Sequence, residues 1–216
     1  ERIVPPLPTM SPAEVLEALS AQASIAPVDA LISADAHRFV LVEPLLQAIE
    51  RGLEDPADLS EQEALLFTHA LYLLGKWREV RAYPLVIRWL SLPHDGAEVL
   101  TGDVVTEDGD RILAAVCDGN LEPIKALILN READEFSRAI ASGALARLAA
   151  WREVPRPVIV AELLWLAREG LEREASHLWS ALAVNCADIE ALEVFPELRR
   201  ATDEGLIDPQ SFDLAE

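Results

Sequence analysis

The tetrapeptide Trp77-Arg78-Glu79-Val80 recurs as Trp151-Arg152-Glu153-Val154, 74 residues further along the chain. Each copy follows an apolar run with helical spacing, and each precedes a proline that opens another apolar run. This pattern predicts a repeated unit of two helices joined by a short polar turn. A helix pair of this kind buries its apolar faces on the pair before it and the pair after it.

The same layout occurs four times, and a proline marks the start of the second helix each time. These prolines are spaced 39, 34 and 39 residues apart, at Pro84, Pro123, Pro157 and Pro196. A period of about 37 residues fits HEAT-like repeats better than the strict 34-residue tetratricopeptide unit. The sequence therefore predicts an all-α fold, a HEAT-like α-α superhelix (solenoid) of about five to six helix pairs.

We expect one domain over residues 1–216, without an internal linker. Residues 1–12 read as an extended Pro-rich arm, residues 13–58 as N-terminal capping helices and residues 60–208 as the repeats. The segment 93–110 is rich in glycine and predicts a longer connection with one short helix.

Helix ends are marked in several places. Ser60 with Glu63 forms a capping box that opens a helix. Gly75, Gly170 and Gly205 each follow an apolar helical stripe, so we expect them to supply the left-handed residue that ends a helix.

Composition excludes several classes of function. The chain has 216 residues, 18 Lys and Arg against 38 Asp and Glu, a net charge of −20 and 51% hydrophobic residues. Whole-chain disorder does not fit that apolar content, and the charge disfavours nucleic acid and anionic membranes as partners. No apolar run approaches the ~18–20 residues of a membrane span. Cys117 and Cys186 lie far from any second thiol, which favours a reduced, cytoplasmic location.

Four strings of the sequence resemble a bacterial family catalogued as domain of unknown function 1186. They are Leu66-Phe67-Thr68-His69-Ala70-Leu71-Tyr72-Leu73-Leu74-Gly75, Ser91-Leu92-Pro93, Gly102-Asp103-Val104-Val105-Thr106-Glu107-Asp108 and Ser176-His177-Leu178-Trp179-Ser180-Ala181-Leu182. The resemblance covers roughly residues 40–208 and implies an all-helical repeat protein with no established activity or catalytic set. Some members carry a C-terminal SecA-type cluster of Cys and His that binds metal, and this sequence has no such cluster.

The two Trp-Arg-Glu-Val turns allow two interpretations. In the structural one, Trp77 and Trp151 wedge between neighbouring repeats; in the functional one, Trp and Arg form a ridge that anchors a partner. The candidate binding residues are Trp77, Arg78, Trp151, Arg152, His177 and Trp179. Apolar stripes around Trp89, Trp165 and Trp179 also predict core positions for these three side chains.

The acidic segment 94–122 gives an alternative hypothesis. His94, Asp103, Glu107 and Asp108 could ligate a hard divalent cation, and a metal-dependent enzyme or metal-binding protein would follow. The simpler interpretation is a solvated connection in which Thr106 caps the next helix. No helical His pair, EF-hand spacing or nucleophile elbow supports the metal or enzyme hypothesis.

The favoured function is therefore a non-enzymatic scaffold that binds a protein or peptide and needs no cofactor. Charge favours a basic partner, because an acidic surface steers a basic segment toward it. The acids concentrate in residues 94–122 and 188–216, where we expect such a partner to bind.

Overall fold

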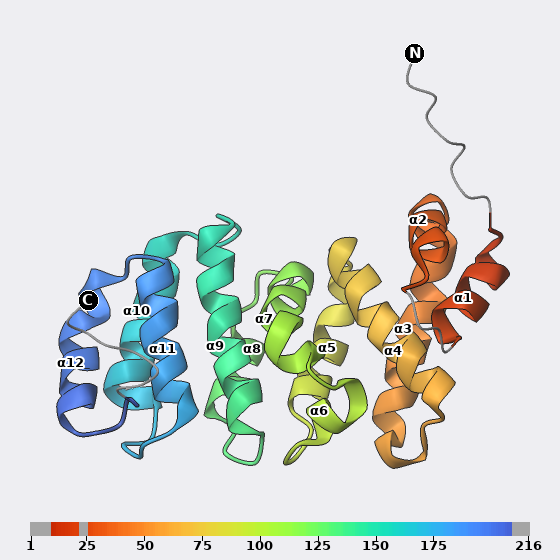
Figure 1. Cartoon of the computed structure of the whole chain (residues 1–216). Coiled ribbons are helices and arrows are strands. Elements are labelled where there is room, and N and C mark those ends of the chain that lie inside the picture. Colours follow the sequence, from red (N-terminus) through yellow and green to blue (C-terminus); the bar gives the residue numbers. More distant parts are fainter. Residues whose placement is uncertain (1–9, 22–25, 209–216) are drawn as a thin grey trace.

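The computed structural model describes residues 10–21 and 26–208, and their regular structure is helical throughout (Figure 1). The predicted all-α class is therefore confirmed. The α-helices are α1 (Pro12–Ser20), α2 (Val28–Ala36), α3 (Arg38–Glu54), α4 (Glu61–Lys76), α5 (Tyr83–Leu90), α6 (Gly96–Thr101), α7 (Val104–Val116), α8 (Glu122–Leu129), α9 (Glu135–Ala150), α10 (Arg156–Trp165), α11 (His177–Asp188) and α12 (Phe195–Asp203). Residues 1–9 of the expected Pro-rich arm lie outside the described residues.

Shorter helical turns join some of these helices. Three of them are 3-10 turns and one is a π-helical turn: η1 (Pro56–Asp58), η2 (Val80–Ala82), η3 (Leu166–Gly170) and η4 (Leu192–Val194). Within residues 10–21 and 26–208 there is no strand, and isolated bridges join Pro93 and His94 to Ala133. No helix in this part of the chain has both the length and the apolar character that crossing a bilayer requires.

The helices form a row that is two layers deep (Figure 1). The longer helices α4, α7, α9 and α11 pack against one another in sequence order and make one layer. The shorter helices α5, α8 and α10 lie behind them. Helix α5 packs against α7, α8 packs against α9, and α10 packs against α9 and α11. At the N-terminal end, α1 and α3 pack against α4, and α2 packs against α1 and α3.

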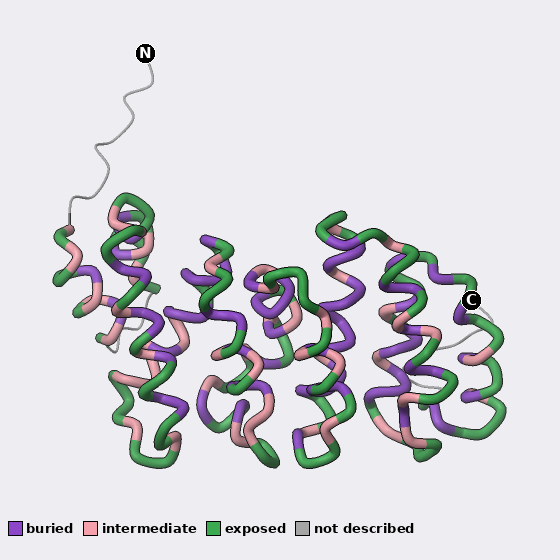
Figure 2. Tube along the Cα trace, turned by 180° about the vertical axis from the view of Figure 1, so that it is seen from behind, coloured by how far each residue is buried: buried purple, intermediate pink, exposed green. Residues whose placement is uncertain are grey.

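One apolar cluster runs through the row, from Val15 in α1 to Ile207 after α12. Its largest fully buried members include Trp89 and Trp179. Buried positions recur in every helix, whereas the turns at the two edges of the row are largely exposed (Figure 2). Trp165 is 37% exposed, so the prediction that it belongs to the core is wrong.

The four repeat prolines each occupy the first turn of a short helix, in α5, α8, α10 and α12. Proline suits this place because the first turn leaves its backbone N–H groups without intrahelical acceptors. The capping box of Ser60 and Glu63 is also present at the start of α4. These local signals are therefore confirmed.

The Trp-Arg-Glu-Val turns end their helices through the same pair of hydrogen bonds. After α4, Arg78 N–H donates to Gly75 and Glu79 N–H donates to Leu74; after α9, Arg152 and Glu153 repeat this pattern. The pattern is a Schellman motif, in which the residue after the cap takes a left-handed conformation. Arg78 and Arg152 take it, with φ of 53° and 62°.

A third turn of this type follows α11, with no Trp or Arg in it. Glu190 has φ of 54°, its N–H donates to Ala187, and the next N–H donates to Cys186. The three turns are equivalent parts of the repeat, although only two of them share a sequence that can be recognised.

Some predicted helix boundaries were wrong. Gly75 lies inside α4 and Gly170 ends η3, and neither has a positive φ, whereas Gly205 does, at 73°. Helix α7 begins at Val104, so Thr106 is inside it, where its hydroxyl donates to the carbonyl of Asp103. The expected connection with one short helix is present as α6.

Candidate functional site

Four hollows lie next to one another along the layer of long helices, with volumes of about 330, 100, 290 and 400 Å³. Neighbouring hollows share lining residues: Trp151 borders the first and second, Gly143 the second and third, and His177 the third and fourth. We call this row the groove. We call its first hollow, between α4, α7 and Trp151, the notch.

The notch results from helix length and from the Trp-Arg-Glu-Val turns. Helix α7 has 13 residues, whereas α4 and α9 on either side have 16 each. The turns after α4 and α9 can therefore meet beyond the end of α7. Arg78 of the first turn forms an ion pair with Glu153 of the second, and its guanidinium lies 5.2 Å from the ring centre of Trp151.

Stacking fixes the Arg78 side chain above the notch. A guanidinium over a tryptophan face is attracted by the ring quadrupole, by about 0.5–1 kcal/mol at an exposed site. Arg147 approaches the same ring at 5.9 Å. Trp151 thus contacts two arginines, one from α9, which Asp110 also binds, and one from the turn after α4.

A polar network lines the side of the notch formed by α7. Tyr72 donates a 2.9 Å hydrogen bond to Asp108, and Arg111 pairs with the same carboxylate at 3.0 Å. Burial, together with the hydrogen bond to Asp108, raises the pKa of Tyr72 to about 12. The hydroxyl therefore stays protonated and remains a donor at neutral pH.

The second hollow lies over a link between α7 and α9. The Nε atom of Arg147 donates to Asp110 over 2.9 Å. Gly143 allows this close approach, because a Cβ atom there would lie 3.2 Å from the Cβ of Asp110. The next link, between α9 and α11, is a 2.7 Å hydrogen bond from Asn185 to Ser142.

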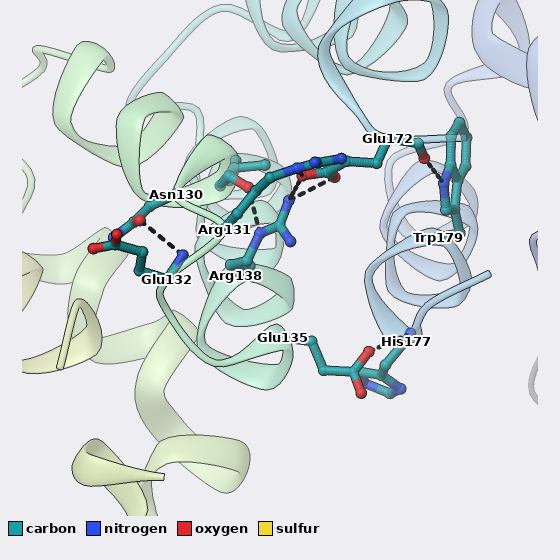
Figure 3. Close-up of polar contacts among 9 residues, drawn as sticks. Asn130, Arg131, Glu132, Glu135, Arg138, Glu172, His177 and Trp179 are labelled. Atoms are coloured by element: carbon teal, nitrogen blue, oxygen red, sulfur yellow. Dashed lines mark hydrogen bonds and ion pairs between the residues drawn. The ribbon is translucent and has the colours of Figure 1, made fainter. Parts of the chain in front are cut away.

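His177 lies at the far end of the groove and lines its last two hollows. Its backbone N–H donates to Glu135 over 2.8 Å (Figure 3). Its ring centre lies 4.6 Å from that of Phe136. Trp179, by contrast, is 1% exposed and donates to the carbonyl of Glu172 over 2.9 Å (Figure 3). Trp179 is therefore a core residue and does not line the groove.

Glu172 joins the segment after α10 to α9. Its carboxylate accepts two hydrogen bonds from the buried Arg138, at 2.8 and 3.1 Å, and pairs with Arg131 (Figure 3). Burial opposes ionisation of Glu172, but the hydrogen bonds from Arg138 and Arg131 outweigh it and lower its pKa. This network braces α9 against the segment that follows η3.

The remaining binding candidates are not part of the groove lining. Trp77 is 6% exposed; its indole donates to Asp35 over 2.9 Å and its carbonyl accepts from Arg38. It wedges α4 against α2 and α3, as the structural interpretation predicted. Arg152 is exposed, and its side chain has no hydrogen bond or ion pair with the residues that the structure describes.

The structure does not gather the residues of the metal hypothesis. Among the described residues, no three His, Cys, Asp or Glu side chains lie close enough together to hold an ion. His94 is exposed at a turn with φ of 55°, and Asp103 and Glu107 are exposed at the start of α7. Asp108 alone reaches the notch, where Tyr72 and Arg111 already contact it.

Several lining residues were missed from the sequence, namely Tyr72, Lys76, Arg111, Arg147 and Asn185. Helical spacing could have found some of them. Lys76 lies four residues after Tyr72, and Arg147 lies four residues before Trp151, so each pair shares a helix face. Which face of α4 turns toward α7 depends on how the helices pack, and no sequence motif encodes that packing.

Comparison with known proteins places this chain in a family. Residues 10–216 match the family described as "Protein of unknown function (DUF1186)". An "Uncharacterized protein" of Chlamydia trachomatis serovar D is 29% identical over 201 residues, which are 93% of this chain and 80% of that protein. An "Uncharacterized protein" of Chlamydia muridarum is 29% identical over 200 residues, 92% and 80% of the two chains. No solved structure matches. Because the family match covers nearly the whole sequence, the chain belongs to the DUF1186 family of proteins of unknown function, as the resemblance predicted.

Proposed function

We propose that this chain is a HEAT-like repeat protein that binds an extended segment of another protein along the groove and catalyses no reaction. In this proposal residues 1–216 are one domain, 13–58 cap its N-terminal end, and 60–208 form the superhelical repeats. The recurring long helix, Schellman turn and proline-led short helix support it.

The groove carries the proposal. Its four hollows run from α4 to the residues after α12, and each shares lining residues with the next, so one extended chain segment can contact them in turn. Its lining mixes aromatic, aliphatic and charged side chains, as protein interfaces do. Arg and Trp, the residue types that most often dominate binding energy, both line the notch.

We expect the partner to carry net positive charge. The chain has a net charge of −20, and the acids of segments 94–122 and 188–216 would steer a basic protein toward it. We place this encounter in the cytoplasm, which suits two cysteines that are both free thiols.

Photo-crosslinking tests the groove against an equally exposed control position. Val184 lines the third hollow and is 40% exposed, whereas Val158 on α10 is 44% exposed and lies outside the groove lining. A photoreactive residue at Val184 is expected to capture a discrete protein band in bacterial cells. The same residue at Val158 is expected to capture none.

Equal capture from both positions would mean that the adducts reflect random collision, and it would contradict binding in the groove. Capture from Val158 alone would place the partner on the layer of short helices instead. Turnover of a small molecule by the purified protein, with no adduct from Val184, would favour an enzyme.

A further inference from the structure

The notch concentrates cations in a protein that has few of them. The chain holds 18 basic and 38 acidic residues. Three basic side chains line the notch, Lys76, Arg78 and Arg111, against one acidic lining residue among those described, Asp108. Each of these cations is paired with a carboxylate, Asp35, Glu153 or Asp108, and the first two of these acids lie outside the notch lining.

These cations are available to a ligand. The side chains of Lys76, Arg78 and Arg111 are 56, 52 and 61% exposed, and each holds a surface ion pair. Exposed pairs of this kind contribute only about 0–1 kcal/mol, so an incoming anion can replace them. Stacking on Trp151 keeps the Arg78 guanidinium over the notch, which reduces the entropy lost when a ligand binds.

The floor below the cations is apolar. Gly75 and Ile112 are buried there, and Ala115 is half-buried beside them. Gly75 adds no side chain, and the notch has a volume of about 330 Å³. The space therefore suits an apolar side chain that enters beneath an anionic group.

The end of a polypeptide combines both groups on one residue. In an extended peptide, neighbouring side chains point in different directions, opposite in a strand and about a third of a turn apart in polyproline II, so an Asp or Glu next to an apolar residue would point away from the floor. A C-terminal residue carries its carboxylate on the same Cα as its side chain. We propose that the notch binds the C-terminal residue of the partner, its apolar side chain on the floor and its free carboxylate between Arg78 and Arg111.

This inference rests on the proposed peptide-binding function and specifies which end of the partner is bound. Two synthetic decapeptide libraries test it. Both have nine random positions followed by leucine; one ends in a free carboxylate and the other in an amide. Affinity selection on the purified full-length protein identifies enriched sequences, and fluorescence anisotropy then gives the Kd of each acid and its matching amide.

The acid is expected to bind about 10- to 100-fold more tightly than its amide, the range that follows from losing hydrogen bonds to a charged group. This advantage should shrink in Arg78→Gln and in Arg111→Gln. Arg88→Gln is the matched control, because Arg88 is an exposed arginine on α5 outside the notch lining. Circular dichroism checks that each variant is folded, and the acid–amide comparison on the unaltered protein needs no variant.

Acids and amides that bind equally well would overturn the inference. Amides that bind only when an Asp or Glu precedes the leucine would overturn it too, since an internal side chain would then supply the charge. Enrichment of neither library would also overturn it. In all these cases, photo-crosslinking from Val184 still tests the proposed scaffold function. The C-terminal inference and the scaffold function can therefore fail separately.

Discussion

Replacing Arg152 by glycine is expected to stabilise the protein. Arg152 lies in the left-handed region with φ of 62°, where a Cβ atom crowds the following carbonyl oxygen. Its exposed side chain has no hydrogen bond or ion pair within the described part of the chain. Glycine therefore relieves strain and removes no known contact.

The size of the effect follows from two opposing terms. A left-handed residue with a side chain costs about 1–2 kcal/mol. Glycine gives back about 0.5–1 kcal/mol, because its freer unfolded chain loses more entropy on folding. The net gain in the free energy of unfolding is therefore about 0–1.5 kcal/mol. Arg152→Ala keeps the strain and should leave stability nearly unchanged.

Urea unfolding at 25 °C measures these differences in the free energy of unfolding. If the m-value is the same for all variants, a shift in the transition midpoint gives the difference in stability. Gln47, exposed near the middle of α3, gives a control with the opposite sign. In a helix interior glycine is less favourable than alanine by about 1 kcal/mol, so Gln47→Gly should be less stable than Gln47→Ala.

The refuting result is an Arg152→Gly protein that is less stable than Arg152→Ala. Such an order would mean that residue 152 does not hold a left-handed conformation in solution. The turn after α9 would then not be a Schellman motif, and the shared geometry of the three turns would lose its basis.

Three further tests probe an ion pair, a buried thiol and a helix cap. Glu172→Gln leaves the buried Arg138 without its countercharge and should cost about 2–3 kcal/mol at pH 7. Because the folded-state pKa of Glu172 is lowered, its stabilisation is full above the unfolded pKa and is lost as the pH falls through the folded one. The unfolding free energies of the variant and the original protein should therefore converge below about pH 4.3. Burial raises the pKa of Cys186 to about 12, so its thiol should react with a thiol reagent at pH 8 far more slowly in the folded protein than in urea; equal rates would contradict its burial. Ser60→Ala removes the capping box with Glu63 and should lower the free energy of unfolding by about 1 kcal/mol, whereas Ser91→Ala, at the C-terminal end of α5, removes no N-cap and should cost less.

The sequence predicted those features that depend on local chemistry. The prolines of α5, α8, α10 and α12 fit the first helical turn because its N–H groups have no intrahelical acceptor. The capping box of α4 supplies acceptors for such free N–H groups. Both can be read without knowing what packs against the helix. The helical spacing of the apolar residues likewise predicted an all-α chain.

Sequence reasoning was weaker where geometry decides. Gly75 was expected to end α4, but Arg78 takes the left-handed position, which arginine fills only at a cost in strain. Trp77 and Trp151 are followed by the same three residues, yet Trp77 is buried against α2 and α3, whereas Trp151 borders the notch. The difference arises from what packs beside each turn, which is a property of the neighbouring repeat and not of the tetrapeptide.

The side-by-side packing of α4, α7, α9 and α11 also sets the length and the residue spacing of a peptide that binds across them. Packed helix axes lie about 8–10 Å apart, so three steps span about 27 Å. A polyproline II segment rises 3.1 Å per residue with three residues per turn, which is about 9.3 Å per turn. Its turn is therefore commensurate with the helix spacing, and every third residue would meet the next helix in the same orientation. About nine residues would span the row, and shortening a ligand by three would remove one helix from the contact.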